Sequence, residues 1–510
     1  MNDDFQIIGV KVPESFGEIL SPLVSGHVWG VYWRPLIRIL YNFLLFTAGH
    51  TPVVFHAAGL VLFLGVIITV YLLSVRITRS QVTALITSAL FVVLPSRELP
   101  ALWIADQVEL LVFIFTGLVY LTSKNYADTG ERKHLILALL MMTGALLSKE
   151  LAFMAVLLPA LMWAATGSAR PAMMRHLTLT GGFTILTGAL LSYRAFVIES
   201  NLFAARHLAD TGFLRMAKNF ILYIPSVFAG PDQFGYILSG SLTGYIIAGA
   251  ALLLAGVLAY FALRRMLQER ESSPIYILGA GWFILFLLPV LPVYMRWYVF
   301  TASFGVILII AHLLGGIYSG LKKPGSVLAP VVVIILILSS HNIFLSQKWN
   351  DAGKLASDIG RNITANKRFV ENNTILLWGV PDKLNRVPVM KLGQKEMFEF
   401  YSGSEAADIR SPLRAELFGN SPDIQMLSAD SAGFSMVLYG GRFLQEGDGS
   451  KLLLKSEQTE FTYESYTVRI ETRVEEGYPI ALVYIKGDII EKGKLHLWFT
   501  GREFKRIKNE

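Results

Sequence analysis

Long apolar runs alternate with short polar and basic segments over most of this chain. Ten of these runs approach the length of about 20 apolar residues that a helix needs to cross a bilayer. They are residues 53–75, 80–95, 101–122, 134–148, 151–166, 176–196, 244–263, 274–293, 298–318 and 324–345. Only Lys149-Glu150 separates the fourth run from the fifth, so these two can instead form one bent or re-entrant element. The pattern predicts a polytopic α-helical membrane body of about ten helices over residues 53–345.

The stretch before the first run is mixed in character. Residues 36–48 are too short to span a bilayer, and Arg38, Tyr41 and Asn42 interrupt their apolar positions. This pattern predicts a helix lying in the membrane interface, within a first loop of residues 1–52. The loop of residues 197–243 is the longest between runs, and we expect it to cover a site at the membrane surface.

After Leu345 the pattern becomes that of a water-exposed domain, residues 346–510. Helical periodicity predicts an amphipathic helix over 347–369 and a short helix over 394–401, and the apolar run 374–380 predicts a buried strand. Period-two stretches at 461–470 and 494–499, separated by glycine-containing turns, predict antiparallel strands. The fold class is therefore a polytopic α-helical membrane protein with a C-terminal α+β domain.

Composition agrees with a membrane protein. Hydrophobic residues make up 53% of the chain and charged residues 16%, against roughly 25% charged in soluble domains. The net charge of +7 comes from short clusters between apolar runs rather than from one basic patch, so we expect a lipid bilayer and no nucleic acid as partner. The chain has no cysteine, which excludes disulfides, thiolate metal sites and cysteine nucleophiles.

Basic residues predict the orientation, because Lys and Arg favour cytoplasmic loops. If residue 1 starts outside, every basic cluster falls inside, and the C-terminal domain lies outside with the N-terminus. These clusters are Arg76 and Arg79, Lys124, Arg132 and Lys133, Arg170 and Arg175, Arg264, Arg265 and Arg270, and Lys322 and Lys323. The expected location is a bacterial inner (plasma) membrane. An N-terminus outside also suggests a further helix ahead of Met1; the alternative is a short tail that crosses without one.

Ionisable groups at membrane edges are costly unless they bind something. Those on the predicted outer side are Asp3, Asp4, Arg34, Arg97, Glu98, Asp106, Glu109, Lys149, Glu150, Arg194 and Arg296. Such a mixture suits a reaction in which a carboxylate takes a hydroxyl proton while cations hold a phosphate leaving group.

Four pieces of the chain resemble, in order, elements of the polytopic GT-C glycosyltransferases, in the branch of protein O-mannosyltransferases and their bacterial relatives. Residues 94–111 read LPSRELPALWIADQVELL, with a proline, an acidic residue, an Ala-Trp-Ile-like core and a second acidic residue before Leu-Leu. The other pieces are Tyr32-Trp33-Arg34-Pro35-Leu36, Leu147-Ser148-Lys149-Glu150 and Arg296-Trp297-Tyr298. Asp3-Asp4 stands where such enzymes carry an acidic pair in the first extracytoplasmic loop.

The resemblance covers residues 2 to about 320 and implies an inverting transferase with a polyprenyl-phosphate sugar as donor. Asp3 or Asp4 would act as general base on a hydroxyl of a protein, lipid or glycan acceptor. The residues that the resemblance assigns to substrate binding are Tyr32, Arg34, Arg97, Glu98, Glu109, Lys149, Glu150 and Arg296. The chain departs from the family pattern around Arg97, where a histidine is usual, and at Gln107, where an arginine is usual.

Each assignment has a purely structural alternative. Asp3-Asp4 can be a solvated tail, Arg34 and Arg296 interfacial anchors, Lys149-Glu150 a neutral pair between helices, and Arg97 and Glu98 partners of each other. Paired carboxylates are compatible with Mg²⁺ or Mn²⁺, although nothing in the sequence requires a metal. Two other functions stay open: a transporter or flippase of a cell-envelope precursor, and a membrane scaffold without activity.

Overall fold

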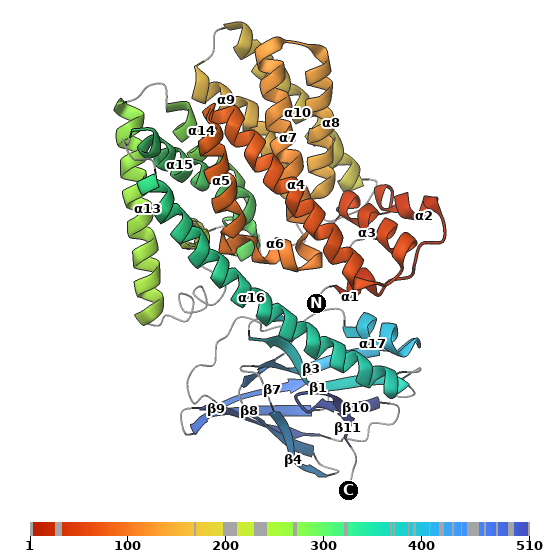
Figure 1. Ribbon diagram of the computed structural model, residues 1–510. Helices are drawn as coiled ribbons and strands as arrows, with labels where there is room; N and C mark the ends of the chain where they lie inside the picture. Colours follow the sequence, from red (N-terminus) through yellow and green to blue (C-terminus); the bar gives the residue numbers. More distant parts are fainter. Residues whose placement is uncertain are drawn as a thin grey trace. The chain divides into compact units, whose positions relative to one another are not determined.

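A computed structural model gives the fold. It describes residues 4–25, 33–167, 170–196, 212–228, 242–268, 273–320, 325–367, 370, 373–385, 387–390, 394–406, 408–417, 423–430, 433–439, 441–445, 458–463, 466–475, 478–487 and 494–507. The chain divides into two compact units (Figure 1). One is helical and comprises Val12–Ile343; the other combines Met1–Lys11 with Phe344–Glu510.

Each of the ten predicted apolar segments coincides with helical structure. The helical unit contains α2 (Phe16–Leu20), α3 (Pro35–Ala48), α4 (Pro52–Thr78), α5 (Gln81–Val93), α6 (Glu98–Leu102), α7 (Val108–Thr129), α8 (Arg132–Ser148), α9 (Leu158–Thr166), α10 (Arg170–Phe196), α11 (Phe213–Ser226), α13 (Leu242–Gln268), α14 (Ser273–Leu287), α15 (Val299–Gly320) and the start of α16 (Gly325–Ala365). Short 3-10 turns join several of them: η1 (Ser21–Leu23), η2 (Pro95–Arg97), η3 (Ile104–Asp106), η4 (Glu150–Leu157), η6 (Leu288–Val290) and η7 (Arg296–Tyr298).

Six helical stretches among the described residues are long and apolar enough to cross a membrane. A seventh arises if α5 and the following Pro95–Leu102, bent by 60° against it, form one span. Helix α3 and the stretch Glu150–Thr166 are apolar but shorter. The chain is therefore an integral membrane protein with several helical spans, and the full count of about ten crossings stays a prediction.

Aromatic rings from distant segments fill the core of the helical unit. Phe113 of α7 packs against Phe91 of α5 and Phe300 of α15, with ring centroids 5.3 Å and 5.9 Å away. Trp282 of α14 is buried beside them, 5.1 Å from the ring of Phe304. These contacts hold α5, α7, α14 and α15 together around one core.

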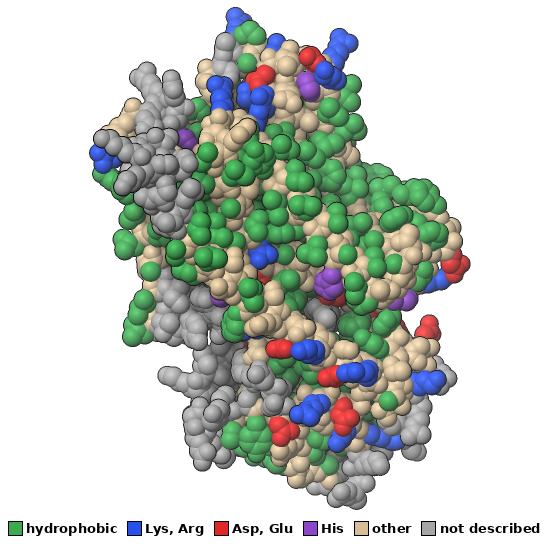
Figure 2. All heavy atoms as spheres, viewed as in Figure 1, with side chains coloured by type: hydrophobic (Ala, Val, Ile, Leu, Met, Phe, Trp, Pro, Cys, Tyr) green, Lys and Arg blue, Asp and Glu red, His purple; other side chains and the backbone are tan. Residues whose placement is uncertain are grey.

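The outer surface of the helical unit is apolar. In Figure 2 hydrophobic side chains cover much of the visible face of this unit, while most acidic and basic side chains gather at its upper end and over the second unit. Exposed leucine, isoleucine and valine side chains line α4 and α13, as expected for helices that face lipid.

The second unit contains two β-sheets. A mixed sheet has the order β11-β10-β1-β3-β6, with β2 beside β1, and an antiparallel sheet has the order β4-β5-β9-β8-β7. The strands are β1 (Thr374–Leu384), β2 (Val387–Pro388), β3 (Asp408–Leu417), β4 (Asp423–Asp430), β5 (Gly433–Tyr439), β6 (Gly441–Gln445), β7 (Gln458–Tyr463), β8 (Tyr466–Glu475), β9 (Tyr478–Lys486), β10 (Lys494–Phe499) and β11 (Phe504–Arg506). Helix α1 (Phe5–Ile8) packs against α17 (Gln394–Ser402) through Phe5 and Phe400, whose ring centroids lie 6.1 Å apart.

This unit confirms the predicted α+β class, with three differences. The amphipathic helix expected at 347–369 is the continuation of α16 and not a separate element. The period-two stretch 461–470 belongs to two paired strands, β7 and β8. The stretch 494–499, predicted as an antiparallel strand, is β10, which pairs antiparallel with β11 but parallel with β1; β1 in turn runs parallel to β3. The helix α17 between β1 and β3 supplies the connection that a parallel pair requires.

Candidate functional site

Lys149 and Glu150 lie at a break between two helices, and the break sends their side chains in different directions. Helix α8 ends at Ser148, Lys149 has an extended backbone (φ −161°, ψ 151°), and η4 begins at Glu150. The two side chains therefore do not follow one helical face, and each finds a separate partner. The predicted alternative, in which they neutralise each other, is not what the structure shows.

Glu150 accepts contacts from two arginines that are distant in the sequence. Its Oε2 atom lies 3.1 Å from Nη2 of Arg34, which precedes α3, and its Oε1 atom lies 3.0 Å from Nη1 of Arg194 on α10. Burial alone would raise the pKa of the Glu150 carboxyl, but the two guanidinium groups hold this pKa below its usual value. Glu150 is therefore ionised at neutral pH and joins α3, η4 and α10.

Lys149 forms a buried ion pair with Glu109 in the first turn of α7. The side chains of Lys149 and Glu109 are 4% and 0% exposed, so water does not screen this pair. The ammonium group also lies 4.7 Å from the ring centroid of Tyr298 in η7. Burial tends to lower the pKa of Lys149, but the Glu109 carboxylate raises it above the usual value, so the lysine is charged.

A third ion pair joins η7 to α6. Nη1 of Arg296 lies 3.5 Å from Oε2 of Glu98, and both residues line a small cleft with Pro95, Ser96, Leu99 and Ser226. Trp297, the next residue, meets Trp103 edge to face with centroids 5.9 Å apart. Glu98 thus pairs across the fold with Arg296, whereas the guanidinium of Arg97 lies 5.6 Å from the Phe63 ring centroid.

Asp106 is a further acid close to these charges. It is 5% exposed, and it interacts electrostatically with Glu109, Lys149, Arg34 and Arg296. Among the residues that the structure describes, its Oδ2 atom has no hydrogen-bond partner, and the same is true of Oε2 of Glu109. The cluster thus combines three acids in ion pairs, four cations and the carboxyl group of Asp106.

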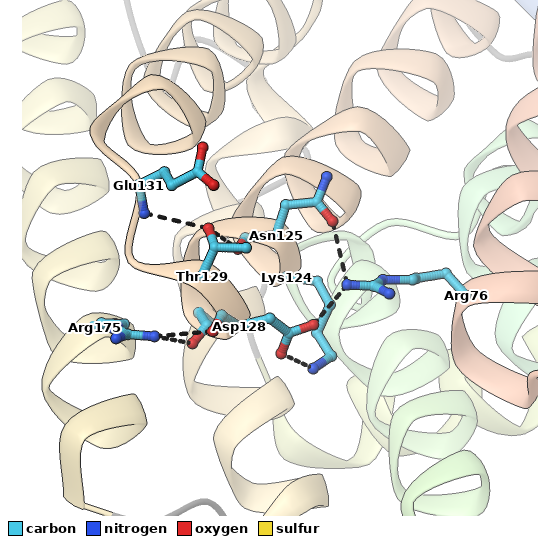
Figure 3. A network of polar contacts seen from close by, with 8 residues as sticks. Arg76, Lys124, Asn125, Asp128, Thr129, Glu131 and Arg175 are labelled. Carbon is cyan, nitrogen blue, oxygen red and sulfur yellow. Dashed lines mark hydrogen bonds and ion pairs between the residues drawn. The ribbon is translucent and has the colours of Figure 1, made fainter.

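The opposite ends of the same helices carry a second polar network (Figure 3). Asp128, in the last turn of α7, lies 2.6 Å from Nη2 of Arg76 on α4 and also contacts Lys124. Arg175 of α10 donates to the carbonyl oxygen atoms of Ala127 and Asp128, at 2.9 Å and 3.1 Å, and so caps the end of α7. Asp128 and Arg76 are 39% and 40% exposed. Exposed pairs of this kind are typical of solvated helix ends, which distinguishes this end from the buried cluster.

Three of the sequence-predicted site residues cannot be placed in the cluster. Asp3 and Tyr32 lie outside the described residues. Asp4 is buried at the start of α1 and belongs to the unit that contains the β-sheets. Their proposed roles stay predictions. The remaining candidates, Arg34, Glu98, Glu109, Lys149, Glu150 and Arg296, make the ion pairs described above, and Arg97 lies next to Glu98.

Sequence reasoning placed Asp106 and Arg194 at the predicted outer edge but gave neither a role. Asp106 ends the turn η3 just before α7, three positions ahead of Glu109, and this helical spacing could have indicated that the two acids lie on one face. Arg194 stands alone at the end of an apolar helix, and no sequence signal connects it with Glu150. Among the described residues no group of three or more His, Asp or Glu side chains is arranged to hold a metal ion.

Comparison with known proteins gives one distant relative. No family model matches the chain. A stretch of 138 residues, 27% of the chain, is 28% identical to the protein O-mannosyl-transferase Tmtc1 of Drosophila melanogaster. The matched stretch spans 16% of that relative's length. The similarity is to part of a transferase, and activity, substrates and partners of this chain are proposals.

Proposed function

We propose that this chain is a membrane glycosyltransferase that moves a sugar from a polyprenyl-phosphate donor to an acceptor hydroxyl outside the cytoplasm. The observation that carries the proposal is the buried charge cluster at one end of the helical unit. Exposed ion pairs at the other end need no substrate to explain them. At this end, in contrast, two cations and three acids are buried and a further three charged groups are partly buried, which is costly in a membrane protein without a function. The similarity to a protein O-mannosyl-transferase supports the same class of reaction.

The cations suit the phosphate of such a donor. Arg34, Lys149 and Arg296 come from three separate elements, and the carboxylates paired with them fix their positions before a ligand arrives. Fixed cations stabilise a developing negative charge without reorganisation during the reaction. In the proposed step the acceptor oxygen bonds to the anomeric carbon, the bond from that carbon to the phosphate oxygen breaks, and polyprenyl phosphate leaves.

A base must take the proton of the acceptor hydroxyl. Asp3 and Asp4 are the proposed bases, on the resemblance of their position to an acidic pair in the first loop of GT-C enzymes. The ion pair between Glu98 and Arg296 joins the ends of α6 and η7, and a placement at helix ends favours a transferase over the transporter or flippase alternative. Mannose and protein hydroxyls are the first sugar and acceptor to try, because the relative's name contains both.

Transfer of radiolabelled sugar in membranes that contain the full chain tests the proposal. The parent is compared at matched expression with Asp3→Asn, Asp4→Asn and Arg34→Gln, and with Asp128→Asn at the exposed helix end as the control. We expect transfer by the parent and the control, and a loss of about 100-fold or more when the base is removed. Adding a chelator to the same assay tests metal dependence. Absence of transfer from every polyprenyl-phosphate hexose by the parent would overturn the proposal.

A further inference from the structure

Buried polar atoms without partners concentrate in one short segment of the helical unit. Between Trp103 and Glu109, four atoms have no hydrogen-bond partner within the described part of the chain: Nε1 of Trp103, Oδ2 of Asp106, Oε1 of Gln107 and Oε2 of Glu109. Buried polar groups in native proteins are nearly always hydrogen-bonded, so such a concentration calls for an explanation. The four residues are between 0% and 8% exposed.

The side chains of this segment are held in place by other contacts. Gln107 donates from Nε2 to the carbonyl oxygen of Phe55 at 3.0 Å, and its amide group packs directly against Gly59. A Cβ atom at Gly59 would lie 2.3 Å from Nε2 of Gln107. The ring of Trp103 is fixed against Trp297. Unused hydrogen-bonding capacity on fixed side chains is the expected state of a binding site before its ligand arrives.

We propose that Trp103 and Asp106 bind the sugar of the donor, while the neighbouring cations bind its phosphate. This inference rests on the proposed function and deepens it. A sugar hydroxyl would donate to Oδ2 of Asp106, and a second oxygen of the sugar would accept from Nε1–H of Trp103. The ligand class is a neutral polyol, here a hexose joined to polyprenyl phosphate.

The chemistry of these atoms suits a sugar. The carboxyl group of Asp106 and the indole N–H of Trp103 together offer hydrogen-bond acceptor and donor atoms, which match the hydroxyl groups of a polyol. Arg34, Lys149 and Arg296, in contrast, only donate. The segment and the cations therefore recognise different parts of one ligand. The ring of Trp103 packs against Trp297, the neighbour of Arg296, and this contact places the two sets of groups in one neighbourhood.

Ligand binding to the purified full-length chain separates this role from a structural one. The probes are polyprenyl phosphate alone and polyprenyl-phosphate mannose, glucose and galactose, measured by competition with radiolabelled polyprenyl phosphate. The variants are Asp106→Asn, which keeps the side-chain shape, and Trp103→Phe, which removes the indole N–H; Asp128→Asn, at the exposed end of α7, is the control. We expect at least one polyprenyl-phosphate hexose to bind the parent more tightly than polyprenyl phosphate alone. Each site variant should weaken binding of that hexose conjugate about tenfold, which is the effect of losing one hydrogen bond. Affinity for polyprenyl phosphate alone should not change.

Several outcomes would overturn the inference. The first is that the hexoses add no affinity in the parent. The second is that both site variants weaken the binding of polyprenyl phosphate and of its sugar conjugates equally, because such a uniform loss indicates a structural role, with water as the hydrogen-bond partner of these side chains. Equal loss in Asp128→Asn leads to the same conclusion. If the parent transfers sugar while these results hold, the proposed function stands and only the sugar subsite fails. If the parent binds none of the probes, both proposals fail.

Discussion

The ammonium group of Lys149 contacts a carboxylate oxygen of Glu109, and neither side chain is more than 4% exposed. Removal of one partner would leave the other charge buried and unpaired. We therefore expect Lys149→Met to destabilise the helical unit by about 3–5 kcal/mol. The double variant Lys149→Met/Glu109→Leu should recover much of this loss, because no lone charge is left. Thermal unfolding in detergent measures both; equal destabilisation by the single and double variants would contradict this account.

The ion pairs of Glu150 should stabilise the folded protein by the same amount throughout the neutral pH range. Its folded-state pKa is lowered by Arg34 and Arg194, so its stabilising effect is complete above the usual carboxyl pKa of about 4.3 and is lost only as the pH falls through the lowered value. Replacement by Gln should lower the melting temperature by a constant amount between about pH 5.5 and 8. Melting curves of parent and Glu150→Gln over this range provide the test, and a difference that varies between pH 6 and 8 would refute it.

Helices α14 and α15 cross with glycine against glycine. A Cβ atom at Gly305 would lie 2.1 Å from the carbonyl oxygen of Gly279, whereas one at Gly256 of α13 meets no atom within 4 Å. Gly305→Ala should therefore cost about 1–3 kcal/mol through forced separation of the two helices. Gly256→Ala should be neutral or slightly stabilising, because alanine favours helix. Melting temperatures of the two variants, measured beside the parent, test this prediction. An unchanged melting temperature for Gly305→Ala would contradict it, because it would show that the two helices can separate at no cost.

In the second unit, His496 joins the two sheets. Trp378 of β1 donates from Nε1 to Nδ1 of His496 at 3.2 Å, and Tyr466 of β8 lies 3.1 Å from Nε2. Because an indole nitrogen only donates, Nδ1 must be the acceptor, and Nε2–H donates to the tyrosine oxygen. Trp378→Phe should destabilise this unit by about 1–3 kcal/mol through the unpaired acceptor.

Hydrogen exchange of the amides in β1, β8 and β10 measures this effect locally. The exposed Tyr484, replaced by Phe, is the matched control and should leave exchange unchanged. Faster exchange confined to the helical unit in Trp378→Phe would show that the contact does not hold the sheets together.

The sequence predicted which segments are helical better than it predicted which charges meet. Apolar runs mark helices such as α4 and α15 because each run satisfies its own backbone hydrogen bonds in lipid. The partners of Glu150 come from residues 34 and 194, and no local pattern encodes a pairing across such distances. The sequence allowed a pair between Glu98 and its neighbour Arg97. In the structure Glu98 pairs with Arg296 instead, while the guanidinium of Arg97 lies over the Phe63 ring.

The parallel strands of the second unit were missed for a related reason. Period-two alternation reports which face of a strand is buried and not the direction of its neighbour. The central strand β1 is buried on both faces, a pattern typical of parallel sheets, and its length was underestimated because Pro381 and Asp382 interrupt the apolar run.

The position of β1 also determines when this unit can fold. Thr374 of β1 pairs with Lys494 of β10, which follows it by 120 residues in the sequence, so one edge of the central strand stays open until β10 has been synthesised. Contacts between residues so distant form slowly, and an exposed strand edge in the meantime invites aggregation or proteolysis. A newly made chain would therefore have its helices inserted well before this domain matures, and a chaperone that shields β1 during that interval would raise the yield of intact protein.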